Sequence, residues 1–168
     1  MPLTLRTPTL DDVQAIAVVH VFAWLRTYRG LVPDEVLEQY TLWKREDQWH
    51  SHLIDPDNPM RHQLAERDGV VIGFVAWGPG RGEARPELVA LYVRPDHWRT
   101  GVGRTLMVAA EASLAQLGNE AFLWVLSENG PARRFYEDTG WTPDGGSRWQ
   151  DFGDKPLLMI RYARRFVS

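Results

Sequence analysis

The chain has 168 residues, of which 44% are hydrophobic and 24% charged, so its length favours one domain and its composition excludes the disordered and collagen-like classes. The net charge of -3 gives no general attraction to nucleic acid or anionic lipid, and the lack of cysteine excludes disulfides, thiolate metal ligands and a cysteine nucleophile. No apolar run approaches the roughly 18 residues of a membrane span and the start lacks a signal-peptide pattern, so we expect a cytoplasmic protein with small-molecule chemistry.

The first third of the chain predicts a short strand followed by helices. Residues 3–6 alternate as a strand does, and Thr9, with an acid three residues later, forms a capping pattern that opens a helix. Apolar residues at three- and four-residue spacing carry this helix to about Tyr28. A second helical region is expected over residues 34–54, with a break near Thr41.

The middle of the chain changes to a strand pattern. Residues 61–67 and 70–77 flank Asp68-Gly69, a dipeptide that meets the positive-φ demand of a two-residue turn, so this stretch predicts a β-hairpin. Residues 87–93 are mostly apolar and β-prone, which is typical of a central strand.

The last third alternates helix and strand. The expected elements are a helix over residues 101–117, a strand over 121–126, a short helix over 131–138 and a last strand over 156–164. Glycine and proline predict loops over residues 78–86 and 143–146. This order of elements indicates an α/β fold with a mixed sheet.

A glycine turn follows the central strand. Gly101 and Gly103 allow bare backbone to approach a ligand where a helix begins, and unpaired amides and the helix dipole favour an anion there. Within residues 81–104, five arginines stand against three acids. A tight structural turn is the alternative interpretation. The turn lacks the Lys-Ser/Thr of a Walker loop, and Leu106 occupies the place of the third glycine in a dinucleotide fingerprint.

Two blocks of sequence around this turn form a recognisable pair. The first runs Leu91-Tyr92-Val93, Pro95 and Trp98-Arg99-Thr100-Gly101-Val102-Gly103. The second follows the spacing Asn-x-x-Ala-x-x-Phe-Tyr-x-x-x-Gly-Phe at Asn129, Ala132, Phe135, Tyr136, Gly140 and Trp141, the last position being tryptophan here. Together they resemble the GNAT superfamily of N-acetyltransferases. The chain departs from the family pattern at Trp98, where glutamine or arginine is usual.

The resemblance implies one acetyltransferase domain over residues 1–168, with a mixed, mostly antiparallel central sheet flanked by helices. It also implies acetyl-CoA as acetyl donor, with its pantetheine along the free edge of the central strand and its pyrophosphate on the glycine turn. The residues implied to contact it are Leu91, Tyr92, Val93, Arg99, Thr100, Gly101, Val102, Gly103, Arg104, Thr105, Asn129 and Tyr136. For Asn129, capping of the following helix is an equal interpretation.

The resemblance also assigns two proton transfers. Tyr136 stands where the family has a tyrosine that protonates the departing thiolate, and Glu87 lies on the strand where a glutamate often serves as base. The alternatives are core packing for Tyr136 and an ordinary solvated acid for Glu87. For the acceptor, the resemblance implies a cleft between the first two helices and the last loop, and its candidate walls are Trp24, Tyr28, Trp43 and Trp149. Trp24 and Tyr28 are the candidate contacts, although aromatic residues at helical spacing also suit a core.

These observations predict an enzyme that transfers the acetyl group of acetyl-CoA directly to a primary amine, on a small molecule or a protein N-terminus. We expect neither metal nor nucleic acid nor membrane as partner. Arg161, Arg164 and Arg165 are expected in solvent, or against an acidic partner or a second copy in a homodimer. A catalytically silent sensor of CoA is the alternative function.

Overall fold

A computed structural model describes residues 2–167, and its elements follow the expected order with one strand added. The strands are β1 (Thr4–Arg6), β2 (Arg61–Arg67), β3 (Val70–Gly78), β4 (Glu87–Val93), β5 (Glu120–Leu126), β6 (Thr142–Phe152) and β7 (Lys155–Arg165). The helices are α1 (Val13–Tyr28), α2 (Asp34–Glu38), α3 (Leu42–Ile54), α4 (Val102–Leu117) and α5 (Gly130–Asp138), with short 3-10 turns at Leu10–Asp12 and Pro95–His97. The predicted break between α2 and α3 is confirmed.

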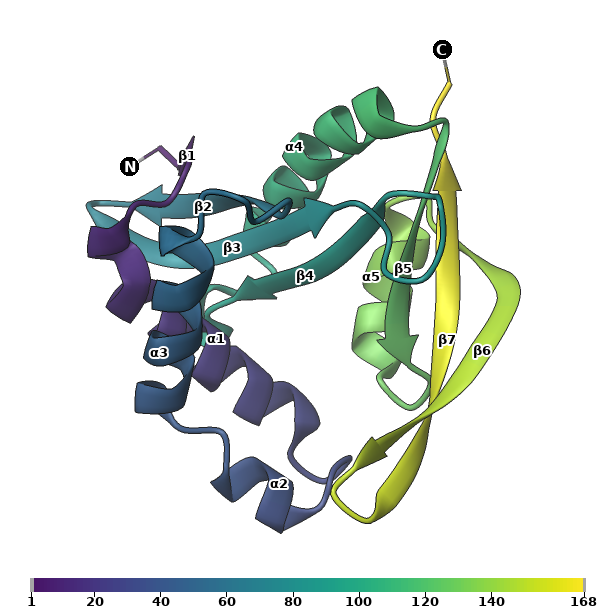
Figure 1. Cartoon of the computed structure of the whole chain (residues 1–168), viewed down its shortest axis with the longest axis horizontal. Coiled ribbons are helices and arrows are strands. Elements are labelled where there is room, and N and C mark those ends of the chain that lie inside the picture. Colours follow the sequence, from purple (N-terminus) through teal and green to yellow (C-terminus); the bar gives the residue numbers. More distant parts are fainter. Residues whose placement is uncertain (1, 168) are drawn as a thin grey trace.

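The strands form one sheet in the order β1-β2-β3-β4-β5-β7-β6. Every neighbouring pair is antiparallel except β4 and β5, which are parallel, so the predicted mixed, mostly antiparallel α+β architecture is confirmed. Helix α4 packs on one face of the sheet, and α1 and α3 pack on the other (Figure 1). The sheet is therefore covered on both sides in its first half.

The β2–β3 hairpin is the predicted one. Asp68 and Gly69 have φ angles of 53° and 77°, and Arg67 pairs directly with Val70 across the turn. Both central residues thus have the positive φ that matches the right-handed twist of the strands. β3, which follows the turn, is buried along almost all of its length.

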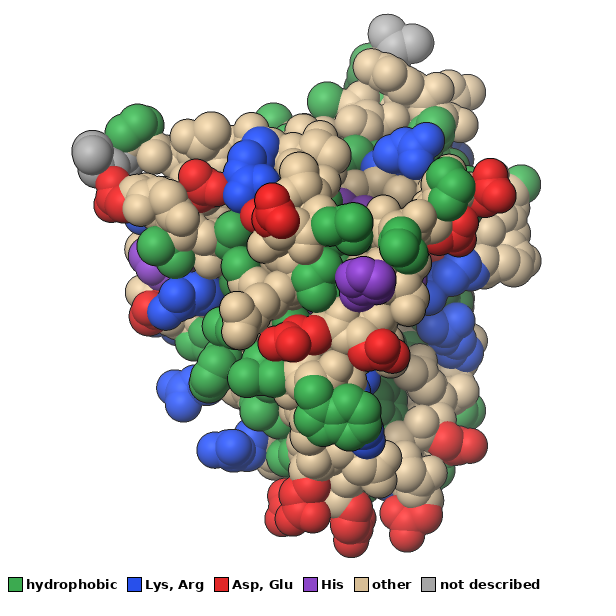
Figure 2. All heavy atoms as spheres, turned by 60° about the vertical axis from the view of Figure 1, so that its left-hand side comes forward, with side chains coloured by type: hydrophobic (Ala, Val, Ile, Leu, Met, Phe, Trp, Pro, Cys, Tyr) green, Lys and Arg blue, Asp and Glu red, His purple; other side chains and the backbone are tan. Residues whose placement is uncertain are grey.

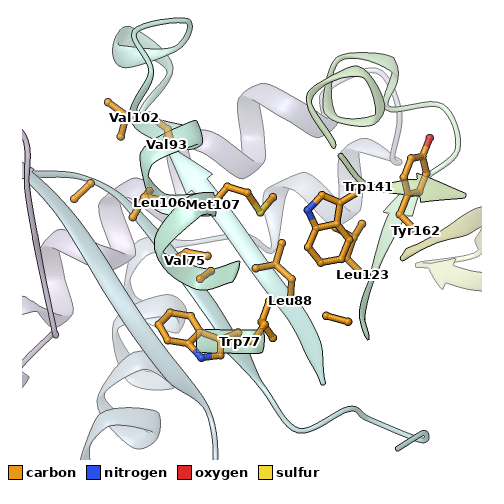
Figure 3. Close-up of a cluster of buried hydrophobic side chains, with 14 of the residues drawn as sticks. Val75, Trp77, Leu88, Val93, Val102, Leu106, Met107, Leu123, Trp141 and Tyr162 are labelled. Atoms are coloured by element: carbon orange, nitrogen blue, oxygen red, sulfur yellow. The ribbon is translucent and has the colours of Figure 1, made fainter. Parts of the chain in front are cut away.

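The larger core lies between α4 and the sheet (Figure 3). Leu106 and Met107 of α4 lie above the sheet, and the side chain of Met107 extends toward the indole of Trp141. Trp141 is fully buried, and its Nε1 donates to Glu111 Oε1 at 2.9 Å, so the indole loses no hydrogen bond on burial. This core fixes α4, and with it the loop that precedes α4, against the central strands.

Two expectations from the sequence are wrong. The stretch 143–146 is not a separate loop but part of β6, where the register with β7 shifts between Pro143 and Ser147 and Gly145 has a φ of 90°. β6 is an edge strand whose side chains are nearly all exposed, so it carries no apolar alternation that a sequence pattern could reveal.

The basic end of the chain is also less free than expected. Arg161 pairs with Glu83 at 2.9 Å and with Asp144 at 2.8 Å, and Arg164 Nε lies 3.5 Å from Glu111. These two arginines join β7 to neighbouring segments, and Arg165 alone is largely exposed, at 87% of its side chain.

Acidic side chains gather at the lower end of the face in Figure 2, where Figure 1 places α2. That helix carries Asp34, Glu35 and Glu38, all exposed.

Within residues 2–167, none of the helices combines the length and the apolar character needed to span a membrane.

Candidate active site

The strands β4 and β5 separate directly after they meet (Figure 1). Within the part of the chain that the structure describes, a single pair, Glu87 with Phe122, joins them. Beyond it β5 pairs with β7, while β4 continues beside β3 as far as Val93. The edge of β4 that includes Leu91 and Tyr92 is therefore open to an extended ligand, which could bond to it as an added strand.

The loop between β4 and α4 presents free backbone amides. Arg99 and Gly101 have φ angles of 62° and 88°, and the helix begins at Val102. Among the described residues, the amides of 99–104 donate to no backbone carbonyl, and the first such bond runs from Thr105 N to Gly101 O at 3.0 Å. A concave set of free amides at a helix N-terminus binds anions such as a pyrophosphate.

The charges near this loop suit a phosphate as well. Arg99 and Arg104 are both exposed, and neither has an ion pair within residues 2–167. The predicted anion site therefore has two unneutralised guanidinium groups beside its amides, and these residues fit the pyrophosphate of CoA.

Trp98, the departure from the family pattern, braces this loop. Its indole Nε1 donates to the carbonyl of Val93 at 2.7 Å, which ties the loop to the end of β4. Thr100 Oγ1 adds a second internal bond, to the carbonyl of His97 at 2.6 Å. The side chain at position 98 thus ties the loop to β4 and leaves its backbone amides free.

Asn129 begins α5 and is buried, with 7% exposed. Its Oδ1 accepts from the amide of Ala132 at 3.3 Å, so the predicted capping role is confirmed. Phe135, one turn further, packs between α4 and α5: a Cβ built on Gly103 would lie 3.5 Å from its ring. The cap and this contact fix the position of the next residue, Tyr136.

Tyr136 lies among other tyrosines. Its ring centre is 6.3 Å from that of Tyr162, and Tyr28 is close enough that a charge on it would act on Tyr136. Burial first, and then Tyr28, raise the pKa of the Tyr136 phenol above its usual value. The hydroxyl therefore keeps its proton at neutral pH and is available as a donor.

Glu87 has a different environment from the one expected. Its side chain is 2% exposed, and both of its oxygens accept from Arg81, from Nη2 at 2.7 Å and from Nε at 3.0 Å. The alternative of a solvated acid is excluded. With both oxygens engaged by one guanidinium, the carboxylate is poorly placed to take a proton from an amine.

The acceptor candidates Trp24 and Tyr28 lie together at the end of α1, with ring centres 4.8 Å apart. The phenol of Tyr28 lies close enough to that of Tyr92 on β4 for each to affect the pKa of the other. Burial raises the pKa of both phenols. The sequence-predicted residues Tyr28, Tyr92 and Tyr136 thus lie near one another beside the opening between β4 and β5, close enough that a charge on one would act on the others.

Trp43 and Trp149, which the sequence also offered as walls of this cleft, are 67% and 69% exposed. Tyr40 takes their place: its ring stacks on Trp24 at 3.9 Å and 4°, and its hydroxyl lies 2.9 Å from His20 Nε2. Tyr40 lies in the break between α2 and α3, where helical periodicity gives no information, so the sequence offered no signal for it.

Comparison with known proteins shows the family to which the chain belongs. Residues 17–141 match the acetyltransferase (GNAT) family. An uncharacterised N-acetyltransferase, YuaI of Bacillus subtilis, is 33% identical over 80% of this chain and 78% of its own length. A spermidine N(1)-acetyltransferase of Thermoplasma acidophilum is 26% identical over 83% of this chain and 88% of its own length.

Solved structures share the fold. The PaiA N-acetyltransferase of Thermoplasma acidophilum, determined in complex with coenzyme A, superposes with a TM-score of 0.79 at 20% identity, covering 99% of this chain and 100% of its own. The family match spans both the glycine turn and the α5 block. The chain therefore belongs to the GNAT family of acetyltransferases and is an acyltransferase that uses acetyl-CoA.

Proposed function

We propose that the chain transfers the acetyl group of acetyl-CoA directly to the primary amine of a small molecule. The observation that carries the proposal is the meeting of Tyr28, Tyr92 and Tyr136 at the open edge of β4. An aromatic acceptor wall, a free strand edge and a protonated phenol lie there together. Its relative from Thermoplasma, a spermidine acetyltransferase, supports a small amine as acceptor.

The cofactor supplies a thioester, an acyl group already activated toward an amine. In this proposal the free amides of residues 99–104, with Arg99 and Arg104, bind the pyrophosphate of the cofactor. The edge containing Leu91 and Tyr92 bonds its pantetheine arm, and Asn129 borders that arm while capping α5. These contacts orient the thioester toward the tyrosines.

Tyr136 is the proposed general acid, which gives its hydroxyl proton to the departing sulfur. In water the phenol has a pKa of about 10 and the thiol a pKa of about 8.5, so proton transfer from the phenol to the thiolate costs about 2 kcal/mol of free energy. Burial raises the pKa of Tyr136, and it raises the pKa of a thiol in the same apolar surroundings for the same reason. The transfer therefore remains feasible within the site.

The amine must lose a proton before it attacks. At neutral pH this costs an alkylamine of pKa about 10.4 some 4 to 5 kcal/mol. Because Glu87 is engaged by Arg81, we assign this step to desolvation. Burial against Trp24, Tyr28 and Tyr92 lowers the pKa of the ammonium, which releases its proton to bulk water as it enters the site.

A panel of primary amines tests the proposal, with release of free thiol from acetyl-CoA as the signal and mass spectrometry of the acetylated product as confirmation. We expect turnover with at least one class of small amine. If acetyl-CoA raises the melting temperature of the protein but no amine releases thiol, the chain is a CoA sensor and the proposal fails.

A further inference from the structure

A partly enclosed apolar cavity lies between α3 and the first half of the sheet, on the face that α1 and α3 cover. It has a volume of about 150 Å³ and is lined by residues that include His20, Trp49, His62, Phe74, Ala76 and Ala90. An apolar protein cavity of about this size accommodates a benzene ring. The proposed tyrosine site does not use this space.

His20 and His62, two of the residues that line the cavity, are uncharged at neutral pH. Trp49 Nε1 donates to His20 Nδ1 at 3.1 Å, and because an indole N–H can only donate, Nδ1 of His20 bears no proton. Burial lowers the pKa of His20 to about 3 and that of His62 to about 4. None of the residues that line the cavity is acidic, so a cationic group placed there would find no counter-charge.

A cation, Arg45, lies close enough to this cavity that its charge acts on His20. Arg45 of α3 lies one helical turn before Trp49 and stacks over the ring of Tyr40 at 4.0 Å. Its Nε is buried without a hydrogen-bond partner, and the side chain has no ion pair within the described residues 2–167. A buried guanidinium edge that lacks an acceptor is costly, and a carboxylate satisfies it in bidentate geometry.

The cavity and the proposed reaction site adjoin along β4. Val89 and Ala90 line the cavity, and the next residue, Leu91, belongs to the open edge. A strand rises about 3.3 Å per residue, so one small molecule can span the two sites. His20 connects them on the other side, because it lines the cavity and contacts both Tyr40 and Tyr92.

We propose that the acceptor is an α-amino acid, or a close analogue, with an uncharged branched or ring-containing side chain. Its amine faces the β4 opening, its side chain fills the cavity, and its carboxylate pairs with Arg45. The inference rests on the proposed acetyltransfer and narrows its substrate. It also excludes polyamines, since their additional ammonium groups would meet Arg45 and neutral imidazoles.

The test compares matched amines that differ by one carboxylate: leucine with isopentylamine, and phenylalanine with phenethylamine, with spermidine as a third arm. We expect kcat/KM for each amino acid to exceed that of its decarboxylated partner by about 10- to 100-fold, the range of a charged hydrogen bond. Arg45→Met should reduce this ratio to near 1.

Lys44→Met is the matched control, because it removes a neighbouring positive charge that lies over Trp43, at 5.5 Å, instead of Tyr40. The amino-acid preference should persist in it. A preference that survives Arg45→Met, or that disappears equally in Lys44→Met, overturns the assignment of Arg45.

Ala76→Leu tests the cavity. Ala76 is 4% exposed and lines the space, so the added methyl groups fill it. We expect KM for leucine and phenylalanine to rise about tenfold or more relative to that for alanine, with the stabilisation by acetyl-CoA retained as evidence of folding. An unchanged ratio of KM values shows that the side chain binds elsewhere and overturns the inference.

The outcomes separate the two proposals. Turnover with spermidine or simple amines, but not with amino acids, overturns the present inference and leaves acetyltransfer to amines standing. Binding of acetyl-CoA without thiol release from any amine overturns both.

Discussion

Glycine at positions 101 and 103 suits the anion loop, our name for the proposed pyrophosphate-binding residues 99–104, for two different reasons. Gly101 has a φ of 88°, a backbone conformation that other residues adopt only with strain, whereas nothing lies within 4 Å of the position its Cβ would take. At Gly103 a Cβ would make ordinary contact with Phe135 at 3.5 Å. A side chain at 103 is therefore tolerated by the fold, and what it changes is the space and charge beside the free amides.

Gly103→Asp should abolish the stabilisation by acetyl-CoA, because its carboxylate would stand beside the bound phosphates. The measurement is the melting temperature with and without ligand. Val108→Asp, the same charge at a site that is 62% exposed further along α4, should keep the shift. A Gly103→Asp protein that folds and still binds acetyl-CoA as the native chain does would place the pyrophosphate elsewhere.

Tyr136→Phe removes one hydroxyl and keeps the ring. We expect turnover to fall about 10²-fold or more, since a general acid contributes at least that much, with little change in acetyl-CoA affinity. Tyr162→Phe is the control: its hydroxyl donates to Glu137 at 2.7 Å and is engaged in the core. Unchanged turnover in Tyr136→Phe, measured where chemistry limits the rate, removes this residue from the mechanism.

Glu87→Gln distinguishes a base from a structural acid. A base would leave a deficit largest at low pH, because at high pH the solvent deprotonates the amine unaided. Since Arg81 occupies both oxygens, we expect a uniform change across the pH profile instead, and a loss of stability of about 1 kcal/mol, small because Arg81 is 64% exposed. A deficit confined to low pH would identify Glu87 as the base.

At the scale of elements, the entry into α1 is held by one carboxylate. Asp12 accepts from Arg6 of β1 at 2.8 Å and 2.7 Å and from the backbone amide of Thr9 at 2.7 Å. Arg6 also reaches Glu66 of β2 at 2.8 Å. The Arg6 hydrogen bonds lower the pKa of Asp12 to about 2, so strand, helix and hairpin are joined through an ionised group.

The folded-state pKa of Asp12 lies below its unfolded value, so the stabilisation is complete above about pH 4 and is lost as pH falls toward 2. Asp12→Asn should cost about 2 kcal/mol at pH 7 and much less at pH 2, as measured by denaturant unfolding. Asp11→Asn, at an exposed neighbour, is the control. Equal losses for Asp12→Asn at both pH values would refute the linkage.

Elements with strong local signals could be predicted from the sequence, and those defined by tertiary contacts could not. Asp68-Gly69 predicted the β2–β3 hairpin, the apolar run predicted strand β4, and the cap at Asn129 predicted the start of helix α5. Strand β6 was not predicted, because its exposed side chains leave no apolar alternation in the sequence.

The site divides in the same way. The glycine turn is local, so its residues are predictable. Tyr40 and Arg45 reach the acceptor side only through the packing of α3 on the sheet, and the pairing of Arg81 with Glu87 depends on how an irregular loop folds back. No spacing in the sequence encodes these contacts.

For the whole molecule, acetyl-CoA should raise stability by mass action on the folded state. At a concentration of 100 times its Kd the gain is about 2.7 kcal/mol, and it grows with the logarithm of concentration. Thermal unfolding at several ligand concentrations measures it. Pantetheine, which lacks the pyrophosphate, should give a much smaller shift. An equal shift would show that the anion loop contributes little.

Within residues 2–167, Glu87 and Phe122 form the one pair that joins β4 to β5, and this has a mechanical consequence for the sheet. The sheet has two parts, β1–β4 and β5–β7, which are joined at one end of β4 and diverge toward the other end. A donor that bonds along β4 occupies the gap as a temporary eighth strand, and its departure as product reopens it. In each catalytic cycle the bound donor would therefore bridge the gap between β4 and β5, and the gap would return when the product leaves. While it is bound, the donor would contribute to the stability of the sheet as a strand does.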